Sequence, residues 1–234
     1  MLIAGIETAT QVCSVALWDG DRRALLAESS LARGNTHSER LMPLLDNLLV
    51  QAGVAKREIG AIAVSIGPGS FTGLRIGLAA AKAMAYAWGV PVTGVSTLAA
   101  LALNVPVPGV LLCPLLDAQK GNAYHACYRW EAGRLQVLQA PAVVAVTDLW
   151  ARFSEPGSPV LLLGEAAKYP IPESIRHRVT LAPEPVRLPR AALVAALGME
   201  QLHENKADDV FGLSPAYIRR SEAEELWEKR QQGL

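Results

Sequence analysis

The sequence has no excess of charge of either sign, because its 22 lysine and arginine residues balance 22 aspartate and glutamate residues. A neutral chain lacks the broad positive surface with which proteins bind nucleic acid unaided. Aromatic residues are also few, at 6% of the 234 positions. We therefore expect any contact of this chain with nucleic acid to be indirect, through a partner.

Long continuous hydrophobic segments are missing as well. Residues 83–116 carry no charged side chain, but glycine and proline residues interrupt them repeatedly. A membrane-spanning helix needs about 20 continuous apolar residues. At the amino-terminal end, Glu7 interrupts the first apolar run, which is unlike a secretory signal. The sequence therefore predicts a cytoplasmic protein with no membrane segment.

Cysteine and histidine are scarce, and their spacing matches no known metal motif. Cys13, Cys113 and Cys127 each lie among apolar, strand-like residues, so we expect reduced cysteines in the core. His37 is predicted on the surface and His125 as a structural residue of a strand. Serine nucleophile motifs are missing too. The sequence predicts neither a metal site nor a catalytic residue.

A glycine-rich segment, residues 65–77, connects a predicted strand at 59–66 to a predicted helix at 74–88. Such a junction points free backbone N–H groups toward an anion at the positive end of the helix. A plain strand-to-helix turn uses the same residue types, and the segment lacks the lysine of a P-loop. We favour the turn and keep phosphate binding as the alternative. The residues beside such a phosphate would be Gly67, Gly69, Ser70 and Thr72, with Ser70 or Thr72 capping the helix.

The order of predicted elements repeats in the two halves of the chain. In each half, a first apolar strand ends in an acid, Glu7 or Asp117, and a second strand ends near a tryptophan. We therefore predict an α/β fold of two similar domains facing a cleft, divided into residues 1–103 and 104–234. A charged tail helix at 221–232 belongs to the second domain, and its packing back on the first domain is kept as an option. The two acids either hold a metal–phosphate complex between the domains or close turns and pair with lysine or arginine.

Small residues recur at every fourth position of the helix at 74–88 and at its start, which leaves one face nearly bare. Such a face allows another helix to approach closely. We expect a helix–helix interface here and assign the opposite apolar face, Ile76, Ala80, Ala83 and Ala87, to the chain's own sheet. Arg75, in the first turn, is expected to pair with Glu39, a ligand or a partner. The residues of the predicted interface on this helix are Gly73, Leu74, Gly77, Leu78 and Ala81.

The segment from Ser65 to Gly77 resembles the bacterial TsaB (YeaZ) family. The resemblance extends to His37-Ser38-Glu39-Arg40-Leu41, to Asp117-Ala118 and to Pro215-Ala216-Tyr217-Ile218-Arg219. It implies a duplicated, actin-like and sugar-kinase-like (RNase H-like) two-domain fold. It also implies an accessory subunit in the synthesis of N6-threonylcarbamoyladenosine in tRNA.

The resemblance implies partners as well. TsaD would carry the catalytic metal and transfer the threonylcarbamoyl group, while the ATPase TsaE would join the complex. The contact with TsaD would use the helices at 36–52 and 73–88, and a homodimer would form without TsaD. No firmly bound cofactor is expected, and ATP or ADP at the complex interface is left open. On the first of these helices, the contact residues would be Leu41, Leu45 and Leu48.

Two positions distinguish this chain from TsaD-like proteins, which place metal-binding histidines four residues apart. Thr97 and Leu101 stand at these positions here, and neither replaces an imidazole. The alternative function for this fold is an ATP-dependent small-molecule kinase. It would require a phosphate cleft between Glu7 and Asp117.

Overall fold

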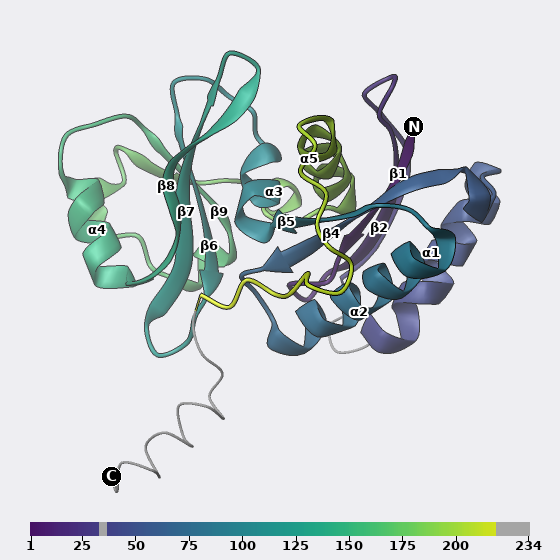
Figure 1. Ribbon diagram of the computed structural model, residues 1–234. Coiled ribbons are helices and arrows are strands. Elements are labelled where there is room, and N and C mark those ends of the chain that lie inside the picture. The colour runs from purple at the N-terminus through teal and green to yellow at the C-terminus, as the bar shows by residue number, and fades with distance from the viewer. Residues whose placement is uncertain (33–36, 219–234) are drawn as a thin grey trace, which may run out of the picture.

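A computed structural model describes residues 1–32 and 37–218 of the chain. Two five-stranded sheets stand side by side, with helices on both faces of the first (Figure 1). The first sheet contains β1 (Leu2–Glu7), β2 (Cys13–Asp19), β3 (Ala24–Leu31), β4 (Ile59–Gly67) and β5 (Val92–Ser96). The second contains β6 (Leu111–Asp117), β7 (Asn122–Glu131), β8 (Arg134–Ala145), β9 (Val160–Gly164) and β10 (Val179–Leu181).

The two sheets have the same topology. The first has the order β3-β2-β1-β4-β5, and the second, read from its other edge, has the order β8-β7-β6-β9-β10. In each sheet the first three strands form an antiparallel meander, and the last two run parallel to the first strand. This repetition confirms the predicted duplicated actin-like fold. Strand β10 is too short for its alternation to be recognised in the sequence.

Helices α1 (His37–Ala52) and α2 (Phe71–Trp88) cover one face of the first sheet, and α5 (Ala191–His203) covers the other (Figure 1). Because side chains alternate along a strand, β1 sends Ala4 and Ile6 toward α1 and α2. Ile3 lies in the apolar cluster with α5. Burial on both faces explains why β1 and β4 of this sheet are nearly continuous apolar runs.

Helix α3 (Thr97–Leu103) joins the two sheets. Its Ala100 packs with the first sheet and α5, whereas Leu98 and Leu101 pack with β6 and β7 of the second sheet. Helix α4 (Val146–Ser154) covers the opposite face of the second sheet through Leu149 and Phe153. The second sheet therefore also has apolar residues on both faces.

Helix α5 lies on the first sheet, although it follows the second sheet in sequence. Glu28 of β3 ties it there: the carboxylate accepts hydrogen bonds from Arg190 Nε at 3.0 Å and from the Ala192 N–H at 3.0 Å. A carboxylate at the amino-terminal end of a helix satisfies free N–H groups and the helix dipole. The proposed boundary at residue 103 stays a prediction, but α5, from the second segment, packs on strands of the first.

The predicted helix after the glycine-rich segment begins three residues earlier than expected. Ser70 is its N-cap, with its side chain accepting from the Gly73 N–H, and the helix starts at Phe71. The predicted tail helix at 221–232 and Thr36, the first residue of the predicted helix at 36–52, lie outside the described residues. Across residues 1–32 and 37–218, no helix has the length and apolar character needed to span a membrane.

Candidate functional site

A pocket of about 660 Å³ lies between the two halves of the molecule. The turn after β1, the start of α2, the end of β6 and residues 216–218 all contribute to its walls. The predicted phosphate-adjacent residues Gly69, Ser70, Thr72 and Asp117 line this pocket. Gly67 and Glu7 are not among the lining residues.

The glycine-rich loop packs against the turn that follows β1. A Cβ atom on Gly69 would lie 2.2 Å from the carbonyl oxygen of Ala9, and the Ser70 N–H donates to that oxygen at 2.6 Å. Gly67 has a φ of +117°, which favours glycine. The glycines thus serve close packing and turn geometry, and the Ser70 and Gly73 N–H groups are already paired within the chain. This supports the strand-to-helix turn over the phosphate loop.

Glu7 is completely buried at the end of β1. One carboxylate oxygen accepts from the Ala9 N–H at 2.6 Å, and the other has no hydrogen-bond partner. Burial raises the pKa of Glu7 from 4.5 to about 7, against hydrogen bonds with Ser65 and Ala9 that lower it. The residue closes a turn in the core, so the structure does not place the two predicted acids together in the pocket.

Glu7 should make the stability of the protein depend on pH. Between pH 4.5 and pH 7, the native protein holds a proton that the unfolded chain has lost, so stability falls as the pH rises through this range. The penalty at pH 8 is on the order of 3 kcal/mol. Glu7→Gln keeps an acceptor for the Ala9 N–H but carries no charge, so it should be more stable than the natural protein at pH 8 and should lack the fall in stability that Glu7 ionisation causes between pH 5 and pH 8.

Urea unfolding at pH 5 and pH 8 measures this difference. Glu39→Gln, at an exposed position in the first turn of α1, is the control and should retain the natural pH dependence. Equal losses of stability in Glu7→Gln and the natural protein would show that another group carries the dependence.

Asp117 lies at the rim of the pocket and has partners within the chain. Its carboxylate accepts from the Gln119 N–H at 2.8 Å and lies 3.3 Å from Lys168 Nζ and from Tyr169 Oη. Partial burial acts to raise the pKa of Asp117, but the Gln119 N–H and the Lys168 ammonium group outweigh it, so the pKa is lowered. Each of the two predicted acids therefore accepts a hydrogen bond from the backbone N–H of the residue two positions after it in the sequence. Asp117 also forms an ion pair with Lys168.

Residues 216–218 contribute a wall of the pocket that was not predicted as part of a site. Tyr217 stacks on Phe71 with ring centroids 4.8 Å apart, and its hydroxyl accepts from Arg75 Nε at 3.0 Å. The Arg75 guanidinium also lies 3.8 Å above the Phe71 ring. Arg75 therefore pairs with aromatic rings rather than with Glu39. The motif around Tyr217 carried the family resemblance, but its distance in sequence from the loop hid this contact.

The prediction that His37 is a surface residue is wrong. Its side chain is buried beside the pocket, and Nε2 lies 2.9 Å from the carbonyl oxygen of Thr10. The imidazole therefore ties the start of α1 to the turn after β1.

The bare face of α2 does not form an exposed interface. A Cβ atom on Gly73 would lie 2.0 Å from the Thr8 carbonyl oxygen, and one on Gly77 would lie 2.2 Å from Thr8 Oγ1. The small residues thus allow α2 to approach the chain's own turn after β1. The other members of the predicted interface are also buried within the chain, namely Leu41, Leu45, Leu48, Leu74, Leu78 and Ala81.

The opposite face of α2 is the one that reaches solvent. Ala79, Ala83 and Ala87 are exposed, while Ile76 and Ala80 are half-buried. On the neighbouring helix α1, Met42 and Val50 are 38% and 80% exposed. The two faces of α2 therefore have the reverse of the roles that the sequence suggested, because glycine was needed where the helix meets its own backbone.

The chain matches the family model "TsaD: tRNA N6-adenosine threonylcarbamoyltransferase" over residues 32–227. It is 33% identical to the tRNA threonylcarbamoyladenosine biosynthesis protein TsaB of Bacillus subtilis, over 97% of this chain and 98% of that protein. The chain belongs to the TsaB family. It is also 29% identical to TsaB of Escherichia coli, over 98% of both chains.

The solved structures agree with this membership. YeaZ from Pseudomonas aeruginosa matches with a TM-score of 0.75 and 25% identity, over 92% of this chain and 99% of that chain. In this TsaB-family chain, Thr97 and Leu101, the two residues that the resemblance matched to the TsaD-like histidines, are wholly buried in α3. Leu101 packs in the apolar cluster between α3 and the second sheet.

Proposed function

We propose that this chain is an accessory, non-catalytic subunit in the synthesis of N6-threonylcarbamoyladenosine in tRNA. Its membership of the TsaB family, shown over nearly its full length, carries this proposal. The presence of Thr97 and Leu101 where TsaD-like proteins have histidines supports an accessory role. Its zero net charge fits a subunit that contacts tRNA through a partner.

TsaD is the partner that the family implies, and the exposed face of α1 and α2 is the proposed contact surface. The exposed residues of these two helices include small alanine side chains on α2 and Met42 and Val50 on α1. Small residues permit a close helix–helix approach, and methionine adapts to a facing surface. The same face would pair with a second copy when TsaD is absent, and TsaE would join the TsaD complex in the cytoplasm.

Reconstitution with each subunit left out tests the proposal. Purified TsaD and TsaE, with tRNA and the precursors of the reaction, should form the modified adenosine only when this chain is added. Mass spectrometry of digested tRNA measures the product. Full product formation without this chain would overturn the accessory role.

Asp117 separates the accessory role from the kinase alternative. Because Asp117 pairs with Lys168, and because Glu7 is buried outside the pocket lining, we expect Asp117→Asn to leave tRNA modification within about twofold of the natural level. A kinase of this fold would instead turn over ATP without TsaD or TsaE and lose that activity in Asp117→Asn. Measuring ATP hydrolysis and tRNA modification on the same preparations decides between the two functions.

A further inference from the structure

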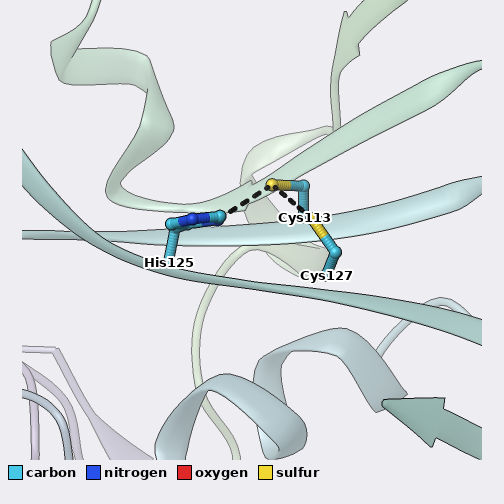
Figure 2. Close-up of side chains that lie close together, drawn as sticks. All are labelled: Cys113, His125 and Cys127. Atoms are coloured by element: carbon cyan, nitrogen blue, oxygen red, sulfur yellow. Dashed lines mark hydrogen bonds between the residues drawn. The ribbon is translucent and has the colours of Figure 1, made fainter. Parts of the chain in front are cut away.

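Three side chains with metal-ligating atoms lie close together on one face of the second sheet, and none of them lines the pocket. Cys113 on β6 and Cys127 on β7 have their sulfur atoms 3.9 Å apart, and Cys113 Sγ lies 4.0 Å from His125 Nδ1 (Figure 2). One ligand atom from each residue lies within 4.8 Å of the others. All three residues are buried, and neither cysteine forms a disulfide.

Strand pairing fixes this arrangement. The antiparallel register that pairs Leu112 with Tyr128 and Leu115 with His125 places Cys113 opposite Cys127. His125 and Cys127 are two residues apart on β7, so both side chains point to the same face of the sheet. Opposite residues on adjacent strands keep nearly constant separations. The cluster is thus built on rigid strands rather than on a loop.

We propose that Cys113, His125 and Cys127 bind a zinc ion. A tetrahedral zinc with Zn–S bonds of about 2.3 Å holds two sulfur atoms about 3.8 Å apart, and a sulfur and a nitrogen about 3.6 Å apart. The distances of 3.9 Å and 4.0 Å in the structure are close to these values. Two thiolates also neutralise the charge of Zn²⁺, which makes the complex compatible with burial.

Gln139 on β8 gives the site a route to solvent and a support for the imidazole. Gln139 lies opposite Cys127 on the neighbouring strand and is only half-buried. The side-chain nitrogen Nε2 of Gln139 lies 3.1 Å from His125 Nε2. If the side-chain amide of Gln139 is flipped by 180°, its oxygen can accept a hydrogen bond from the His125 Nε2–H group. This hydrogen bond would direct His125 Nδ1 toward the metal, as such partners do in zinc sites. A water beside Gln139 would complete the tetrahedron.

The surroundings favour a metal with a structural role. On this side of the sheet the cluster packs with Leu115, Leu149, Phe153 and Leu162, which join β6 and β9 to α4. A zinc ion here would link β6 to β7 beneath α4. It would therefore stabilise the second half of the molecule rather than act in the pocket.

The test uses the full chain, kept reduced with a phosphine, and Zn²⁺ and Co²⁺ as probes. We expect one zinc per chain by elemental analysis, and thiolate-to-cobalt absorption bands that saturate at one equivalent of Co²⁺. The affinity for Co²⁺ should fall ~100-fold or more in Cys127→Ala and in His125→Gln. Cys13→Ala removes the third buried cysteine, in the first sheet, and should bind as the natural chain does.

Native mass spectrometry of the natural chain gives a result that does not depend on the folding of any variant. The expected mass is that of the chain plus one zinc minus two protons. A fully reduced natural chain that binds no zinc and gives no cobalt bands would overturn the proposal. So would equal binding by Cys127→Ala, or a chain two hydrogens lighter that holds a Cys113–Cys127 disulfide even under the reductant.

Discussion

Gly73→Ala is expected to destabilise the protein by about 3 kcal/mol. In an ordinary helix interior the same change stabilises by about 1 kcal/mol, because glycine is the more flexible residue. Here the new Cβ atom would lie 2.0 Å from the carbonyl oxygen of Thr8, a backbone atom. Thr8 is itself held against α2, because its hydroxyl donates to the Gly73 carbonyl at 2.8 Å. The contact can be relieved only by moving α2 away from the turn after β1.

Urea unfolding measures this loss, with Thr72→Ala as the matched control. Thr72 is the preceding residue on the same turn of α2 but is exposed, so its replacement should change stability by no more than about 0.5 kcal/mol. Equal stabilities of the two variants would show that the close approach at Gly73 does not constrain the fold. Since typical stabilities are about 5–15 kcal/mol, the soluble yield of Gly73→Ala should also fall.

Ala83→Arg is expected to weaken binding to TsaD by about 30-fold or more while the chain stays folded. Ala83 lies on the exposed face of α2, where a long charged side chain adds no clash within the chain but prevents close approach of a partner helix. Calorimetric titration with TsaD measures the affinity, and the yield of modified adenosine should fall with it. Sedimentation without TsaD reports whether the chain forms a homodimer and whether Ala83→Arg disrupts it.

The control for this experiment is Ala151→Arg, at an exposed position on α4 of the second half. It adds the same charge to a helix of the same molecule and should bind TsaD normally. If Ala83→Arg also bound normally, the TsaD contact would lie elsewhere on the chain, although the family membership would be unaffected.

Most secondary structure could be predicted from the sequence because buried elements leave a periodic signal. The apolar runs of β1, β4 and β6 and the periodic helices α1 and α5 are of this kind. The repeated order of strands, each set beginning with an acid-terminated strand, was enough to predict the duplication. The resemblance around Ser65–Gly77 then identified the family.

The contacts that depend on three-dimensional placement could not be predicted in the same way. Periodicity shows that α2 has two apolar faces, but it does not show which one meets the sheet. The decisive atom is the Thr8 carbonyl oxygen, which leaves no trace in side-chain patterns. Similarly, Cys113 and Cys127 are brought together only by the register of β6 and β7. The contact of Tyr217 with Phe71 joins residues too far apart for any local signal.

The position of α5 bears on how the chain folds during its synthesis. The second sheet is made from one continuous stretch, residues 111–181, and its strands can pair as soon as that stretch has left the ribosome. The first sheet is synthesised earlier, but the face that α5 covers stays open until residues 191–203 appear. The first half of the protein is therefore synthesised first but is the last to have both faces of its sheet covered. Until α5 is made, the uncovered apolar face of the first sheet is a natural target for chaperones.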